Sequence, residues 1–224
     1  FDFKPGAVFC NLFLADEINR TSSKTQSALL EAMEEGAVTV DSVTRKLPDP
    51  FIVLATQNPS GSAGTQLLPE SQLDRFMIRL SMGYPTVGEE TEILKAKSSK
   101  KAAPQVEPIM TAQDLIEIRS AAEDVFVSDE IYDYIARLSG ATRSDRRLEL
   151  GVSTRGSLAA AAMAKCAAMF KGRNFVIPED VTFVYTDVCA HRIIPARVKG
   201  KLPSDIEVRE ILCDICRGVT PPKI

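Results

Sequence analysis

The sequence has 224 residues, of which 45% are hydrophobic and 25% are charged. This length permits one large or two small domains, and the composition is typical of globular protein, which argues against a disordered or fibrous chain. The 27 basic and 30 acidic residues leave a net charge of −3, so the chain has no overall electrostatic attraction to nucleic acid or anionic lipid. We therefore expect no nucleic-acid partner.

The cysteine pattern and the lengths of the apolar runs indicate where in the cell the protein is expected. Five cysteines, an odd number spread along the chain, do not form the pattern of a disulfide framework and suit a reducing cytosol. No apolar run approaches the roughly 20 residues that are needed to span a bilayer. We expect a cytoplasmic protein without a membrane span.

Residues 1–85 alternate short apolar strands with a helix and a hairpin. The first strand is expected over Leu12–Ala15, and a helix with Leu29, Leu30 and Met33 at helical spacing follows it. Residues 37–47 alternate apolar and polar side chains around an Asp-Ser turn, which predicts a β-hairpin. A second strand is expected over residues 51–55. Because both strands are continuously apolar, they are typical of parallel strands covered by helices on both faces, and the fold class is α/β.

Residues 86–224 have helical spacing almost throughout, which predicts a second, all-helical domain. Its alanine-rich stretch, residues 158–168, should pack closely against a neighbouring helix. His191 reads as a helix-end or packing residue, and only residues 98–108 resemble a flexible linker. The expected helices span residues 89–100, 111–125, 129–138, 153–170, 178–192 and 205–218.

Polar side chains follow both apolar strands directly. Asp16 and Glu17 come after the first strand, and Asn58 comes after the second. A strand that ends in two acids can offer one carboxylate to Mg²⁺ and the next to an attacking water, while a polar residue on the neighbouring strand orients that water. The pattern therefore predicts a nucleotide-hydrolysing site. Taken alone, the two acids could equally be a strand end that meets solvent.

The sequence contains no Gly-x-x-x-x-Gly-Lys-Ser/Thr loop, the segment that cradles phosphates in such sites. Its only Gly-Lys pair, Gly200-Lys201, is followed by Leu202 and has Pro195 where the first glycine should stand. We therefore expect this chain to be part of a longer protein with that loop upstream. By itself the chain should bind ATP poorly and should not turn it over.

Several strings carry a family resemblance: LADEINR (residues 14–20), QSALLEAM (26–33), ATQNP (55–59) and LPESQLDRF (68–76). On these strings the sequence resembles the MoxR family of AAA+ ATPases. The same order continues through GYP (83–85), GVSTR (151–155) and GRNFVIPEDV (172–181), so the resemblance covers nearly the whole chain.

The resemblance implies a parallel-sheet ATPase core, residues 1–85, and a helical lid, residues 86–224. ATP would lie at subunit interfaces of a homo-oligomeric ring, expected to be hexameric. By family analogy Asp16 assists Mg²⁺ binding, Glu17 polarises the hydrolytic water and Asn58 is the sensor that holds this water. Arg75 resembles the arginine finger that enters a neighbour's site, and Arg155, from the lid, resembles the second sensor. Purely structural roles are the alternatives: Arg75 would pair with Asp74 or Glu70, and Arg155 would be a surface charge at a helix start.

The family function implied is ATP hydrolysis coupled to the remodelling or maturation of a protein partner, including the insertion of metal cofactors. A partner with a von Willebrand factor A-type domain is expected by the same analogy. Two alternatives stay open: a magnesium-chelatase ATPase subunit, and a regulatory scaffold that has the fold but no hydrolysis. The hairpin is either a surface excursion or an insert that faces the centre of the ring.

Overall fold

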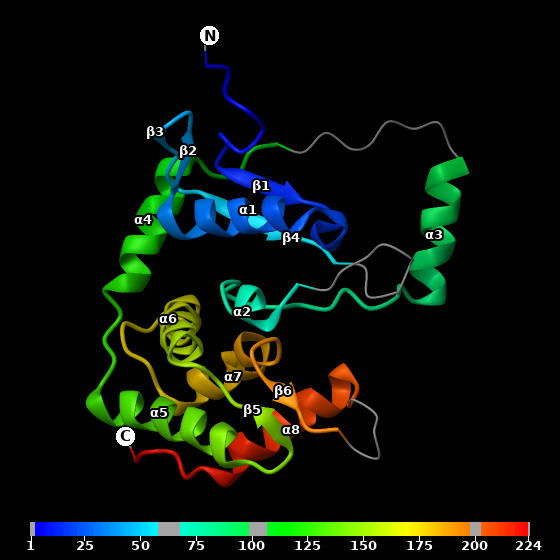
Figure 1. The fold of residues 1–224 in the computed structure, drawn as a ribbon. Helices are drawn as coiled ribbons and strands as arrows, with labels where there is room; N and C mark the ends of the chain where they lie inside the picture. The colour runs from blue at the N-terminus through cyan, green and yellow to red at the C-terminus, as the bar shows by residue number, and fades with distance from the viewer. Residues whose placement is uncertain (1–2, 58–67, 99–106, 198–202, 224) are drawn as a thin grey trace.

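The structure is a computed structural model that describes residues 3–57, 68–98, 107–197 and 203–223. A small α/β part and a helical part lie one above the other in Figure 1, and helix α2 lies between them. Helix α4 passes from the side of the α/β part to the helical part, and α3 stands apart from both (Figure 1).

The α/β part is built on two parallel strands. Strand β1 (Leu12–Ala15) pairs with β4 (Ile52–Ala55) in register, from Leu12 opposite Ile52 to Ala15 opposite Ala55. Because parallel strands in register end at the same edge, the residues after Ala15 and after Ala55 are brought together. The prediction of two neighbouring strands is confirmed.

A short 3₁₀ helix, η1 (Ile18–Arg20), and helix α1 (Ser23–Glu35) lead away from the end of β1. Ser22 caps α1 by accepting a hydrogen bond from the backbone N–H of Thr25 at 3.2 Å. The buried Gln26 donates to the carbonyl of Ile18 at 3.2 Å, so the first turns of α1 are fixed against η1. In Figure 1, α1 overlaps the strand pair in this view and leads to the hairpin.

Strands β2 (Ala37–Val40) and β3 (Val43–Lys46) form the predicted antiparallel hairpin. Asp41 and Ser42 at its turn have φ values of 51° and 63°. Two central residues with positive φ define the two-residue turn whose twist matches that of the strands. The turn therefore confirms the hairpin.

The expectation that helices cover both faces of the strand pair is wrong for the residues described. Leu12, Leu14, Ile52 and Leu54 are between 41% and 61% exposed, whereas their neighbours on the other face are partly buried. Side chains two apart on a strand point to one face, so these four form a single apolar surface. Continuous apolar sequence could not reveal that one face of the strand pair is exposed.

Three helices follow the second strand. These are α2 (Glu70–Leu73), α3 (Val87–Ser98) and α4 (Ala112–Glu123). Helix α4 begins with a capping box, in which Thr111 and Asp114 satisfy each other's backbone N–H. Most of the predicted linker, residues 99–106, lies outside the described residues.

The lid consists of α5 (Asp129–Ser144), α6 (Thr154–Phe170), α7 (Pro178–Cys189) and α8 (Asp205–Gly218). It also contains an antiparallel pair, β5 (Leu148–Leu150) with β6 (Ile194–Pro195), which the sequence did not predict. Helix α5 runs six residues beyond its predicted end, because Gly140 stands inside the helix instead of ending it. Helix α7 ends at Cys189, three residues earlier than predicted.

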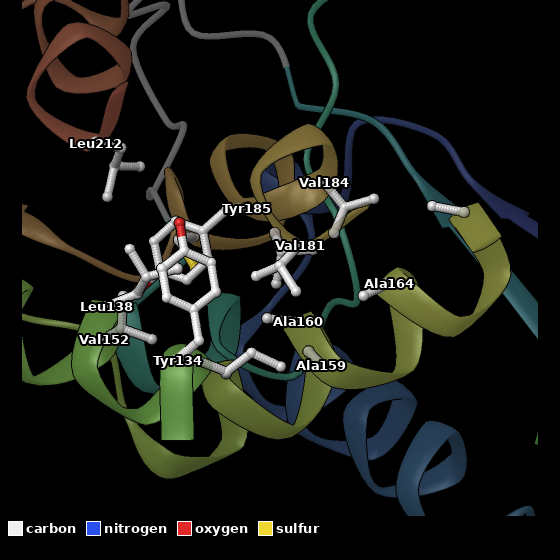
Figure 2. Close-up of a cluster of buried hydrophobic side chains, with 14 of the residues drawn as sticks. Tyr134, Leu138, Val152, Ala159, Ala160, Ala164, Val181, Val184, Tyr185 and Leu212 are labelled. Atoms are coloured by element: carbon white, nitrogen blue, oxygen red, sulfur yellow. The ribbon is translucent and has the colours of Figure 1, made fainter. Parts of the chain in front are cut away.

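Figure 2 shows the apolar core of the lid, where two aromatic rings meet the small side chains of α6. Tyr134 and Tyr185 are at most 1% exposed. Ala160, Ala164 and Ala168, spaced four apart on α6, are completely buried and lie on one face of the helix. The prediction of close packing by the alanine-rich stretch is confirmed. None of the helices described is long and apolar enough to cross a membrane.

Candidate functional site

The two predicted acids lie at the shared end of β1 and β4. Asp16 follows β1, Thr56 follows β4, and the Thr56 hydroxyl donates to Oδ1 of Asp16 at 2.6 Å. The same hydroxyl oxygen accepts from the backbone N–H of Glu17 at 2.8 Å. Backbone bonds from Thr56 to Ala15 and from Ile18 to Thr56, both 3.1 Å, close the arrangement. Thr56 therefore fixes Asp16 and Glu17 relative to the neighbouring strand.

Glu17 has an uncommon backbone conformation. Its φ of 49° and ψ of 49° lie in the left-handed region, which costs a non-glycine residue about 1 kcal/mol or more. Its carboxylate forms an ion pair with Arg20 at 3.0 Å on the exposed side of η1. Such conformations persist where the surroundings fix them, and here the bonds to Thr56 do so. The side chain of Glu17 is 35% exposed and accessible to a ligand.

Asn58, the predicted sensor, lies outside the described residues. Thr56, two residues before it, is described and lies next to Asp16. The sequence reasoning did not single out Thr56, although the predicted strand ends place it directly after Ala55, as Asp16 follows Ala15. The in-register pairing was the missing information.

The two predicted arginines meet at one carboxylate. Arg75, just after α2, pairs with Glu34 at 2.8 Å, and Arg155, in the first turn of α6, pairs with the same Glu34 at 2.7 Å. Arg75 thus has its ion pair with α1 and not with the sequence neighbours Asp74 or Glu70. The two guanidinium groups lie on either side of a single anion.

The acids and the arginines lie at opposite ends of α1. Glu17 precedes the helix by a few residues, whereas Glu34 is its penultimate residue. A helix of 13 residues is about 20 Å long. The acids and the arginine pair are therefore separated by about the length of this helix.

The surface beside the arginines is hollow. A depression of about 290 Å³ is lined by four apolar residues and four charged ones: Met77, Leu158, Ala159, Ala162, Asp74, Arg75, Arg155 and Arg192. Leu158 is 68% exposed and Met77 is 49% exposed. The arginines therefore face an open and largely apolar surface.

Asp74, Ser153, His191 and Arg192 form a largely buried polar cluster next to this surface. The carboxylate of Asp74 accepts hydrogen bonds from Arg192 at 2.7 Å and from Ser153 at 3.0 Å. His191 contacts the carbonyl of Phe76 at 3.0 Å through Nε2. Burial lowers the pKa of His191 to about 4, so its ring is neutral at pH 7 and Nε2 is the donor. Sequence reasoning missed the contact between Asp74 and Arg192 because the two residues are 118 positions apart.

The donor set at the acid end fits Mg²⁺. Carboxylate oxygens are the ligands that Mg²⁺ prefers, and the ion usually takes one or two of them together with substrate phosphates. In the parts of the chain that are described, no group of three or more His, Cys, Asp or Glu is placed to hold a metal ion. A site that relies on one carboxylate and on the nucleotide is consistent with both observations.

Two models of known protein families match this chain. Residues 1–78 match the family model described as "ATPase family associated with various cellular activities (AAA)". Residues 140–211 match the model of the AAA lid domain. The fold and the two matched models thus define an AAA-type ATPase core followed by its lid.

Individual proteins similar to this chain indicate which family of AAA-type ATPases it belongs to. YeaC of Bacillus subtilis, described as uncharacterized, is 43% identical over 215 residues, which are 95% of this chain and 67% of YeaC. Chaperone MoxR1 of Mycobacterium tuberculosis is 40% identical over 203 residues, 87% of this chain and 53% of that protein. Protein MoxR of Methylorubrum extorquens is 25% identical over 82% of this chain and 59% of its own length.

A solved structure from Cytophaga hutchinsonii, described provisionally as an ATPase, superposes with a TM-score of 0.87 at 38% identity. The superposition covers 98% of this chain and 69% of that one. The chain belongs to the MoxR family of AAA+ ATPases. It spans between about half and two thirds of the length of the curated relatives.

Proposed function

We propose that the full-length protein hydrolyses ATP at the interface between two subunits of a ring, with the acids from one subunit and the arginines from the next. One observation carries this proposal: the acid pair and the arginine pair lie at opposite ends of α1. In a ring each subunit presents one end to each neighbour, so two separated half-sites become one complete site at every interface.

The acid half-site binds the metal and activates water. Asp16 would hold Mg²⁺, which when bound neutralises charge on the phosphates. Glu17, the next residue, polarises the water that attacks the terminal phosphate. The hydroxyl of Thr56 holds the carboxylate of Asp16 and the backbone of Glu17, and Asn58, two residues further, is assigned to orient the same water. Phosphoryl transfer depends mainly on such positioning and on charge neutralisation.

The arginine half-site stabilises the transferring phosphate of the neighbour. Arg75 and Arg155 already share one anion, the carboxylate of Glu34, at 2.8 and 2.7 Å. A terminal phosphate is also a compact anion, and arginine can donate two parallel hydrogen bonds to it. An arginine supplied in this way accelerates hydrolysis by about 10³ to 10⁵. On this proposal Arg155 acts with Arg75 on the neighbour and not on the nucleotide of its own subunit.

The energy of hydrolysis is proposed to drive the remodelling or maturation of a protein partner. The relative named Chaperone MoxR1 supports a protein as the object of the work. A hexameric ring, the insertion of metal cofactors and a partner with a von Willebrand factor A-type domain follow from family analogy and belong to the same proposal.

The test is Glu17→Gln in the full-length protein. Because glutamine has the shape of glutamate but cannot polarise water as a base, hydrolysis should fall by at least 100-fold while the Kd for ATP changes less than three-fold. Glu31→Gln, at an exposed acid on the same helix α1, serves as the control and should leave both quantities unchanged. Loss of ATP binding in parallel with turnover would refute the role given to Glu17.

A further inference from the structure

One arginine of the lid, Arg192, makes several of the hydrogen bonds that join the segment carrying Arg75 to the lid. The side chain of Arg192, three residues after the end of α7, is 1% exposed, and its Nη1 donates to the carboxylate of Asp74 at 2.7 Å. The same guanidinium also donates to the backbone carbonyls of Asp74, Phe76 and Met77. Its Nε donates to the carbonyl of Val188 at 2.8 Å, which anchors the side chain to α7.

These bonds bracket Arg75. One guanidinium holds the carbonyl before Arg75 and two carbonyls after it, so the backbone around this residue is fixed to the lid from both sides. A charged group without solvent needs this number of partners, because burying it otherwise costs several kcal/mol. Lysine could not replace Arg192, since an ammonium lacks the planar fork that reaches several acceptors at once.

Asp74 extends the connection to Arg155. Its carboxylate accepts from the hydroxyl of Ser153 at 3.0 and 3.1 Å, and Ser153 is the N-cap of α6, the helix that carries Arg155 in its first turn. The guanidinium of Arg155 lies 3.8 Å from the same carboxylate. Asp74 therefore joins the backbone before Arg75 both to Arg192 and to the start of α6.

The packing leaves room for this cluster. A Cβ atom at Gly156, in the first turn of α6, would lie 3.0 Å from Cδ of Arg192 and 2.6 Å from a methyl group of Val152. Only glycine lets the stem of Arg192 pass so close to the helix. The close contact between Arg192 and α6 therefore depends on glycine at position 156.

We propose that Asp74 and Arg192 are positioning residues that hold Arg75 and Arg155 at a set spacing, so that both reach the terminal phosphate of a neighbour's ATP together. This inference rests on the proposed function, because it assumes that Arg75 acts on ATP. It assigns the catalytic geometry of the interface to the buried Arg192 and the partly buried Asp74, which act through Arg75 and Arg155.

The experiment compares Arg192→Lys with Arg173→Lys in the full-length protein. Arg173 also donates two hydrogen bonds to a buried carboxylate of the lid, that of Asp180, at 2.7 and 2.6 Å, but it has no contact with residues 74–77. We expect Arg192→Lys to lower kcat at least ten-fold while the Kd for ATP changes less than two-fold. Arg173→Lys should leave kcat within two-fold of the unsubstituted protein.

Mixed rings distinguish positioning from a general loss of structure. Subunits with Arg192→Lys have intact acids, so they should regain hydrolysis when their neighbours carry Glu17→Gln and intact arginines. No recovery in rings shown to be mixed would overturn the inference. Should Arg192→Lys fail to fold, Asp74→Asn, which keeps the size of the side chain and one acceptor, is tested in the same way with the same expected recovery.

Arg75→Ala separates this inference from the function on which it rests. If Arg75→Ala abolishes hydrolysis while Arg192→Lys retains more than half of it, the positioning role is wrong and the proposed function stands. If Arg75→Ala itself hydrolyses ATP normally, the role of the arginine half-site is wrong, and the positioning role fails with it.

Discussion

His191 should make the stability of the lid depend on pH below neutrality. The residue is 4% exposed, and burial is the main reason that its pKa falls from 6.5 to about 4. The hydrogen bond with the carbonyl of Phe76 opposes this shift, while the positive charges of Arg192 and Arg79 add to it and Asp74 counteracts it. The folded chain therefore keeps His191 neutral at pH 5, where an unfolded chain protonates it.

The sign and size of the effect follow from linkage. Between pH 6.5 and pH 4 the unfolded state binds the additional proton, so the free energy of unfolding decreases as the pH falls through this window. With the two pKa values above, the loss between pH 7 and pH 5 is about 2 kcal/mol. Carboxylates such as Asp180 contribute little there: although burial raises its pKa, the bond with Arg173 brings the pKa below 3.8.

Hydrogen exchange of the lid amides in the full-length protein measures this free energy. Exchange rates of α5 to α7, corrected for the intrinsic effect of pH, give the opening free energy at pH 7 and pH 5. The unsubstituted protein should lose about 2 kcal/mol, and His191→Gln should lose less than about 0.5 kcal/mol, because glutamine does not titrate. Equal losses in both proteins would refute the assignment of a neutral, buried His191.

Two further substitutions test the lid and the arginine pair. Asp180→Ala removes a completely buried carboxylate that caps α7 and pairs with Arg173, so the opening free energy of the lid should fall by about 3 kcal/mol in the same exchange measurement; a loss below about 1 kcal/mol would contradict this role. Glu34→Gln removes the charge shared by Arg75 and Arg155, and because a triphosphate takes over as their anion in an assembled ring, hydrolysis should stay above half of its normal rate. A ten-fold loss would show instead that the carboxylate of Glu34 is needed during hydrolysis.

Local sequence patterns predicted most of the elements. The apolar runs located β1 and β4, the Asp-Ser turn located the hairpin, and helical spacing located α1 and the lid helices within a few residues at most ends. These features depend on neighbouring residues, which is why periodicity and turn chemistry reveal them. The placement of Asp16 and Glu17 after β1 followed from the same reasoning.

Features that depend on distant residues were not predicted. The convergence of Arg75 and Arg155 on Glu34 joins segments 41 and 121 positions away from it, and nothing local marks Glu34 among the acids of α1. The contact of Arg192 with Asp74 spans 118 positions. The pairing of β5 with β6 was missed because strands of three and two residues are too short to show alternation. The predicted domain boundary at residue 85 stays a prediction.

The segment that follows α2, residues 74–79, is hydrogen-bonded to the lid. The backbone N–H of Arg79 donates to the carbonyl of Asp187 on α7, and Arg209 on α8 donates to the carbonyl of Arg79. Together with the contacts of Arg192, these bonds join residues 74–79 to the helices of the lid. A movement of the lid would therefore carry Arg75 with it.

The most direct test of the account mixes two inactive variants of the full-length protein. Arg75→Ala subunits keep the acids, Glu17→Gln subunits keep the arginines, and neither should hydrolyse ATP alone. In equal, random mixing about a quarter of the interfaces join intact acids to intact arginines, because each ring interface pairs unlike surfaces of two subunits. If the acids and the arginines act across the interface, hydrolysis should recover to about a quarter of the normal rate. No recovery in rings whose mixed composition has been verified would contradict it.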